Sequence, residues 1–222
     1  MVEVLGLKTN IDVLNFTPKG DLLVVNAARC SFDKQHEEFD QEKDSKLLNY
    51  LAREQHVLPF RHPVATLRIT CPIFVLRQLG KHQVGFSWSE VSRRYITGDP
   101  EFWMPDDIRS RPDNIKQGSE SKDWGDNFEA LWHQFDSANR EAMKRYEILL
   151  GQGVAPEQAR AVLPQSMYTT CVVTGTLLGW HHLWKLRTEE HTQLETQEYA
   201  QEIGFLMEQM FPESWKALCK HS

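Results

Sequence analysis

Two periods of apolar residues divide the chain into helical and extended segments. Residues 124–150 carry apolar side chains at intervals of three and four, which predicts one long amphipathic helix ended by the glycines that follow. Residues 64–71 alternate between apolar and polar side chains, and residues 168–175 are rich in β-branched side chains, so each predicts a strand. Pro72 fits the first turn of a following helix, because its missing N–H is not needed there.

Helical segments outnumber extended ones along the rest of the chain. Acidic starts, apolar periods and prolines predict further helices at 21–29, 47–53, 73–82, around Arg160, at 177–187 with a break at Gly179, at 189–210 and from Pro212. Residues 2–7 predict an edge strand, residues 37–46 a solvated charged run, and residues 106–123, which lack a period, a mobile loop or insertion. The pattern favours the α+β class, with helix predominating.

Length and composition narrow the class of protein. A chain of 222 residues with 41% hydrophobic content can bury a substantial core, as one large domain or two small ones. It has no apolar run long enough for a membrane span and no signal-peptide pattern, so we expect a soluble, cytoplasmic protein with no membrane partner. Its four cysteines are scattered without C-x-x-C spacing, which predicts reduced thiols and no metal cage.

The net charge of −6 disfavours a nucleic-acid partner, whose binding footprint is basic. Four cations nevertheless gather in residues 77–95, together with Glu90, His82 and three serines. The helical period predicts Arg77 and Lys81 one turn apart, where two like charges repel unless an anion lies between them. The serine-rich part, residues 86–92, predicts a loop, because serine side chains compete with helical hydrogen bonds. This cluster indicates a site for a small anionic ligand.

The same cluster carries a family resemblance. Arg77-Gln78-x-x-Lys81-His82-Gln83 followed by Glu90-x-Ser92-x-Arg94-Tyr95 resembles the signature of the flavin-dependent thymidylate synthases, in which Arg-His-Arg precedes Glu-x-Ser-x-Arg-Tyr. Lysine and glutamine stand here where the family has arginines. Eight residues rather than seven separate Gln83 from Ser92, and Gly85 is the natural place for the extra residue, because glycine accepts backbone angles closed to other residues.

Other segments extend the resemblance over residues 21–215. Residues 27–33 are similar to a family Ala-Ala-Arg-x-Ser-Phe segment, and Arg160 precedes Val-Leu-Pro as a substrate-binding arginine of the family does. The interval from Arg160 to Arg187 equals that between the two substrate-binding arginines of the family. His191-x-Gln193-x-Glu195-x-Gln197 is similar to a further family motif.

Residues 56–62 are similar to a family segment whose first histidine approaches the flavin. Leu58 and Arg61 replace a threonine and a glutamate there, and in the later helix Thr176, Leu178 and His182 replace an asparagine, an arginine and an asparagine. A metal site at these two histidines is disfavoured, because no third ligand stands at metal spacing. A turn at Pro59 that buries Phe60 explains His62 as well as a flavin contact does, but explains His56 less well.

The resemblance implies one domain over 1–222, with a mixed β-sheet packed with long α-helices, and a homotetramer whose active sites lie between subunits. It implies the reductive methylation of dUMP to dTMP with methylenetetrahydrofolate, FAD and NADPH. The replaced residues keep two alternatives open: a flavin- and folate-dependent pyrimidine nucleotide hydroxymethylase on the same scaffold, and a non-catalytic flavin- or nucleotide-binding homologue.

The resemblance also implies roles for single residues, and the physical chemistry of each side chain is compatible with its role. The catalytic candidates are Ser92, Arg94 and Arg187. The substrate-binding candidates are Arg77, Gln78, Glu90, Ser92, Arg94, Arg160 and Arg187. The cofactor-binding candidates are His56, Lys81, His82, Gln83, Val84, Thr176 and His182. Guanidinium groups fit phosphate oxygens, an arginine can stabilise charge that develops on a uracil carbonyl, and a cation near the flavin favours its reduced anionic form.

Overall fold

The structure is a computed structural model and describes residues 9–96, 98–113 and 118–222. The edge strand expected at residues 2–7 lies outside these residues. Within them, four strands form one sheet in the order β1-β2-β4-β3: β1 (Asn10–Phe16), β2 (Val64–Pro72), β4 (Tyr168–Thr176) and β3 (Phe86–Glu90). All three strand pairs are antiparallel, where a mixed sheet was expected. The predicted α+β class is confirmed.

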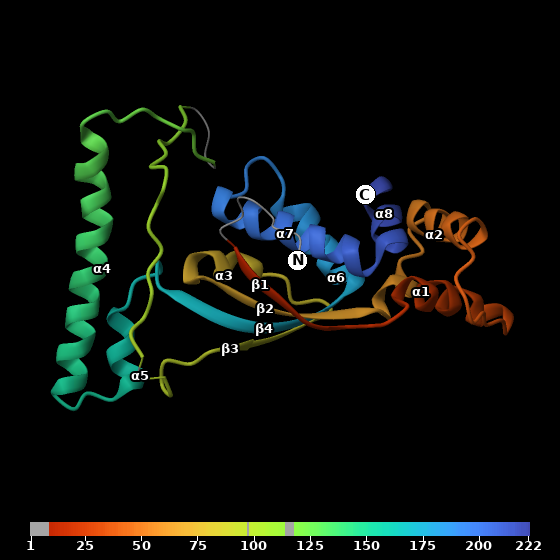
Figure 1. The fold of residues 1–222 in the computed structure, drawn as a ribbon, viewed down its shortest axis with the longest axis horizontal. Coiled ribbons are helices and arrows are strands. Elements are labelled where there is room, and N and C mark those ends of the chain that lie inside the picture. The colour runs from red at the N-terminus through yellow and green to blue at the C-terminus, as the bar shows by residue number, and fades with distance from the viewer. Residues whose placement is uncertain (1–8, 97, 114–117) are drawn as a thin grey trace.

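Helices cover one face of this sheet. Figure 1 shows α6 (Leu177–Arg187), α7 (Leu194–Met210) and α8 (Pro212–Lys220) over that face, with α1 (Gly20–Arg29) and α2 (Lys43–Arg53) at one end of it. These helices agree with the predicted segments, except that α2 begins four residues earlier and α7 five residues later than expected. Gly179 does not break α6. A Cβ at this position would lie 3.0 Å from Thr176 Oγ1 and 3.1 Å from the Phe86 ring, so glycine permits close packing there.

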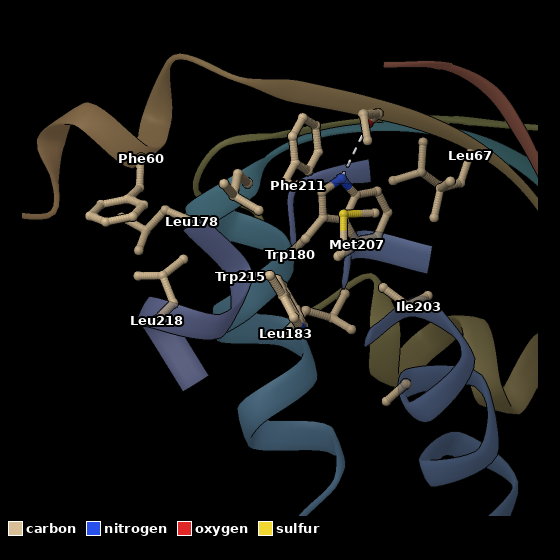
Figure 2. Packing of buried hydrophobic residues seen from close by; sticks show 14 of the residues in the cluster. Phe60, Leu67, Leu178, Trp180, Leu183, Ile203, Met207, Phe211, Trp215 and Leu218 are labelled. Carbon is tan, nitrogen blue, oxygen red and sulfur yellow. Dashed lines mark hydrogen bonds between the residues drawn. The ribbon is translucent and has the colours of Figure 1, made fainter. Parts of the chain in front are cut away.

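A single cluster of buried residues joins the sheet to these helices. Leu67 and Val173 from the two central strands pack against Trp180 of α6 and Ile203 of α7, and all four are fully buried. Figure 2 shows Trp180 at the centre of this packing, with its indole Nε1 donating a hydrogen bond of 3.2 Å to the Ala65 carbonyl. Burying aromatic and aliphatic side chains of this size stabilises the fold by roughly 1.5–3 kcal/mol for each.

The long helix α4 (Asn127–Gly151) confirms the helix predicted over 124–150, but it stands apart from the sheet (Figure 1). Only Asn139 and Tyr146 of its 25 residues are buried. Apolar residues such as Phe135 and Ile148 remain 42% and 40% exposed. The apolar stripe of this helix is therefore only partly covered within a single chain.

Three local predictions were wrong. The serine-rich residues are not a loop, because Phe86 and Trp88 alternate with exposed serines and turn inward, which makes β3 a strand paired with β4. The helix α3 (Ile73–Leu79) ends before Lys81, so Arg77 and Lys81 do not share a helical face. In the charged run, Asp44 is fully buried and binds Arg29 at 2.5 Å.

Residues 106–113 and 118–123, in the segment between β3 and α4, have no regular secondary structure. It is nevertheless anchored to the rest of the fold. Ile108 is buried, Ser110 and Glu120 form an isolated bridge, and Arg109 pairs with Glu195 at the start of α7. No helix in the described part of the chain combines the length and apolar character needed to cross a membrane.

Candidate functional site

A cleft of about 720 Å³ lies where β2, β3 and β4 meet α3 and α5 (Pro156–Ala159). We call it the arginine cleft, because four arginines line it: Arg68, Arg77, Arg93 and Arg160. Four carboxylate residues line it as well: Glu90, Asp99, Glu101 and Glu157. Guanidinium forks bind phosphate oxygens in pairs, while carboxylates can accept hydrogen bonds from a hydroxyl group or a water.

Glu90 enters this cleft from the last position of β3. Its Oε1 accepts a hydrogen bond of 2.9 Å from the hydroxyl of Thr169, a buried residue on β4. The strand pairing aligns Glu90 with Cys171, and the carboxylate raises the pKa of that thiol further, beyond the effect of burial, to about 12. Cys171 is therefore protonated at neutral pH, which makes it a poor nucleophile.

The two residues after β3 that carry the family signature lie at the rim. Arg94 is exposed, and its guanidinium stacks on the Tyr95 ring at 5.2 Å. Ser92 Oγ accepts hydrogen bonds from the Arg94 backbone N–H and Nε, at 3.4 and 3.3 Å. Arg93, which the sequence analysis did not single out, lines the cleft instead. Of these three residues, Arg93 lines the cleft, whereas Ser92 and Arg94 do not.

A second cleft, of about 580 Å³, lies between α3, the end of α6 and the segment before α7. We call it the glutamine cleft, because Gln78 and Gln193 line it with Arg187 and Arg109. Gln78 Nε2 donates to Gln193 Oε1 at 2.6 Å. The arginine and glutamine clefts have no lining residue in common. One chain therefore divides the predicted substrate residues. Arg77, Glu90 and Arg160 line one cleft and Gln78 and Arg187 the other, while Ser92 and Arg94 line neither.

His82 connects the glutamine cleft to the predicted cofactor residues. Arg187 Nε donates to His82 Nε2 at 3.1 Å, so this nitrogen is an acceptor and the ring is neutral. Burial, the Arg187 charge and His182 lower the pKa of His82 to about 4. At neutral pH the His82 ring is thus uncharged, and it accepts a hydrogen bond from Arg187, one of the substrate-binding candidates.

The turn from Gly80 to Gly85 presents three of the seven cofactor candidates to solvent. Lys81, Gln83 and Val84 are exposed, Val84 to 80%, and Gly85 has a φ of +80°. A side chain at Gly85 would clash with Thr176 Oγ1, because a Cβ would lie 2.7 Å away. The predicted glycine conformation is confirmed, and it brings this turn against the N-terminus of α6, where the Thr176 hydroxyl accepts the Gly179 N–H at 3.0 Å.

The remaining cofactor candidates lie further along the same side. His182 is exposed, and burial together with the nearby charges of Arg61 and Lys185 lowers its pKa. His56 is exposed beside Tyr50, at 6.0 Å between ring centroids, while Phe60 is fully buried in a 3₁₀ turn. This surface therefore carries cationic, amide and apolar groups side by side, at Lys81, Gln83 and Val84.

Sequence reasoning missed several lining residues of the arginine cleft. Arg68 lies at an outward position of β2, where alternation predicts a polar residue of any kind, and Glu101 lies in a segment without a period. Their position becomes apparent only when β2, β4 and the segment after β3 come together. The sequence did offer one signal for Arg68, because this residue lies at an outward position of a predicted strand that shortly precedes the signature segment in the chain.

Comparison with known proteins identifies the family. Residues 12–213 match the model of the family described as thymidylate synthase complementing protein. The flavin-dependent thymidylate synthase of Thermosipho africanus is 35% identical over 90% of this chain and 86% of its own length. That of Kosmotoga olearia is 36% identical over 89% and 84%. This chain belongs to the flavin-dependent thymidylate synthase family.

A solved structure supports the same assignment at the level of the fold. The UMP/dUMP methylase PolB from Streptomyces cacaoi, bound with 5-Br dUMP, is similar with a TM-score of 0.84 and 27% identity. The match covers 96% of this chain and 95% of that one. The predicted family, its enzymatic character and its fold are therefore confirmed.

Proposed function

We propose that this enzyme converts dUMP to dTMP by reductive methylation, with methylenetetrahydrofolate as one-carbon donor, FAD as cofactor and NADPH as reductant. Family membership supports the flavin and the nucleotide chemistry. The observation that carries the proposal is the pair of clefts, one built from arginines and the other from Gln78 and Arg187. They offer separate partners for a phosphate and for a pyrimidine edge.

We further propose that the enzyme is a homotetramer. The arginine cleft of one subunit would meet the glutamine cleft of another subunit, together with the surface that carries the cofactor candidates. The partly covered apolar stripe of α4, with Phe135 and Ile148 exposed, supports an assembly, because an apolar patch on a long helix often marks a protein–protein contact. The exposed Val84 beside Lys81 and Gln83 supports a cofactor held between subunits.

Each group of residues would have a distinct task. Arg160, Arg93 and Arg77 would hold the phosphate, with Arg94 and Ser92 closing over it from the rim. Arg187 would donate to a uracil carbonyl and stabilise the negative charge that develops there when C5 becomes nucleophilic, an effect worth up to about 3 kcal/mol for one donor. Neutral His82, Lys81 and Gln83, with Thr176, His182 and His56 further along, would hold the flavin, which supplies the two-electron reduction of the transferred carbon.

A product analysis tests the proposal. The enzyme is incubated with dUMP, methylenetetrahydrofolate, FAD and NADPH, and the nucleotide product is weighed by mass spectrometry. We expect dTMP. A hydroxymethyl product would favour the hydroxymethylase instead, in keeping with the replaced residues Leu58, Arg61 and Leu178, and an unchanged nucleotide with bound flavin would favour a non-catalytic homologue.

UMP is a second candidate substrate. It is favoured by the likeness to a methylase whose solved complexes contain brominated dUMP and UMP. Parallel incubations with UMP and dUMP separate the two, because a site that accepts the 2′-hydroxyl methylates both, whereas a thymidylate synthase acts on dUMP alone.

A further inference from the structure

A chain of four polar side chains crosses the wall of the glutamine cleft. Arg109 Nη2 donates to Glu195 Oε1 at 2.5 Å, and Gln193 Nε2 donates to Glu195 Oε2 at 2.9 Å. Gln78 Nε2 then donates to Gln193 Oε1 at 2.6 Å. We call this chain of Arg109, Glu195, Gln193 and Gln78 the Gln78 relay. It links the segment between β3 and α4 to a substrate-binding candidate on α3.

The direction of every hydrogen bond in the Gln78 relay is set by Glu195. A carboxylate paired with an arginine only accepts, so Gln193 must turn its nitrogen towards Glu195. The oxygen of Gln193 then faces Gln78 and can only accept, which forces the nitrogen of Gln78 towards Gln193. Glu195 is 7% exposed and Arg109 Nε is held by Ser119 Oγ at 2.7 Å, so the origin of the relay is fixed.

A carboxamide can normally turn over and exchange its donor and acceptor, because its two ends have nearly the same shape. The Gln78 relay removes this freedom. It leaves Gln78 Oε1 as the acceptor available to a ligand, beside Arg187, which offers only donors. The cleft thus presents one donor group and one acceptor group from two neighbouring residues.

We propose that the Gln78 relay makes the enzyme selective for uracil over cytosine, with Arg109, Glu195 and Gln193 acting as positioning residues. Uracil has a donor, the N3–H, next to acceptor carbonyls, which complements Gln78 and Arg187. In the same ring orientation, cytosine places the lone pair of N3 against Gln78 Oε1, and two acceptors repel. This inference rests on the proposed function, because it assigns the base of the nucleotide to the glutamine cleft.

Selectivity of this kind can be large, because a buried or partly buried polar group that loses its partner is costly. Glu195→Gln keeps the shape of the side chain but adds an N–H, so Gln193 and Gln78 can both turn over. Gln193→Met keeps the length of the side chain and breaks the relay at an exposed position. Gln201→Met, an exposed glutamine on the same helix, is the matched control.

The test is calorimetric titration of dUMP and dCMP into the FAD-loaded enzyme and its variants. The parent and Gln201→Met are expected to prefer dUMP, and the ratio of the two dissociation constants should fall by about tenfold or more in Glu195→Gln and Gln193→Met. A merely structural role would weaken both nucleotides alike and leave this ratio unchanged. Gln193→Met keeps the test decisive if the Glu195 variant does not fold.

Two outcomes overturn the inference. A folded, FAD-binding Gln193→Met enzyme with the parental preference shows that the relay does not set selectivity, while the parent's binding of dUMP leaves the proposed function standing. A parent that binds neither nucleotide removes the proposed function and the inference together.

Discussion

His181 is buried to 4% exposure beside the rings of Trp184 and Trp215, and neither of its ring nitrogens has a hydrogen-bond partner in the described part of the chain. Burial, with the nearby charges of His182 and Lys185, lowers its pKa to about 4. An unpaired polar ring in such a site costs about 1–3 kcal/mol of stability. Sequence alone could not show this, because the pair of histidines in α6 gives no sign of which one turns inward.

His181→Leu should therefore raise the free energy of unfolding by about 1 kcal/mol at pH 7, since leucine has a similar volume and no polar atoms. The sign of the pH dependence follows from the lowered pKa. The unfolded chain takes up a proton near pH 6.5 and the folded chain only near pH 4, so the parent loses stability as the pH falls through this window.

The variant lacks that loss, and its advantage should widen by up to about 3 kcal/mol towards pH 4. Urea unfolding at pH 7, 5.5 and 4.5 measures the difference. An advantage that stays constant or shrinks as the pH falls would show that His181 is not the buried neutral group described here.

Ser92 stands in the Glu-x-Ser-x-Arg frame that resembles the family signature, and its hydroxyl accepts hydrogen bonds from Arg94. Ser92→Ala should lower turnover of dUMP at least about tenfold, which corresponds to about 1.4 kcal/mol of transition-state stabilisation. Ser87 and Ser89 lie on the exposed side of β3, so their alanine variants should stay within a few-fold of the parent. Steady-state rates with the ranking reversed would mean that the signature is shifted in register.

At the scale of elements, the sequence predicted helices better than strands. The long period of α4 and the proline signals of α8 located these helices to within a few residues. β3 was mistaken for a loop because its serines were weighed more than the alternating Phe86 and Trp88. β1 was not predicted at 10–16, because most of its side chains are exposed and the inward-outward alternation is weak. Both segments are strands because they pair with neighbouring strands of the sheet, and this pairing is not visible in the local sequence.

The start of α2 shows how a charged run can hide a structural residue. Asp44 binds Arg29 of α1 at 2.5 Å, and its second oxygen accepts the Asp40 backbone N–H at 2.9 Å. Asp44→Asn should destabilise the fold by about 3 kcal/mol, because it leaves a mostly buried guanidinium without its counter-charge.

Glu42→Gln is the matched control for this prediction. Glu42 forms an exposed ion pair with Lys46 at 2.7 Å on the same helix, a contact worth less than about 0.5 kcal/mol. Denaturant unfolding of both variants makes the comparison. Equal effects of the two substitutions would contradict the structural role of Asp44.

At the scale of the whole molecule, the sequence predicted one site from residues that lie in different clefts of a single folded chain. Arg160 and Arg187 each match the family, yet Arg160 lines the arginine cleft and Arg187 the glutamine cleft. Spacing along the chain carries no information on whether two residues meet within one subunit or across two. The candidate site was therefore predictable as a list of residues and not as an arrangement in space.

Arg160→Ala should weaken dUMP binding by about 1.5–3 kcal/mol, the range for a hydrogen bond to a charged group, and Arg94→Ala should do the same if the rim closes over the phosphate. Lys34→Ala is the control, because Lys34 is an exposed cation in the N-terminal charged run. Calorimetric titration compares the three variants. Parental affinity in both arginine variants would remove these residues from the site.

Complementation between two inactive variants tests the shared site most directly. Arg160→Ala and Arg187→Ala are produced separately and also together in one cell with two different affinity tags, and dTMP formation is measured for the doubly tagged assembly. If each active site takes Arg160 from one subunit and Arg187 from another, random mixing leaves about a quarter of the sites intact, so the hybrid should recover a corresponding part of the parental rate. A hybrid no more active than either variant alone would contradict a site shared between subunits.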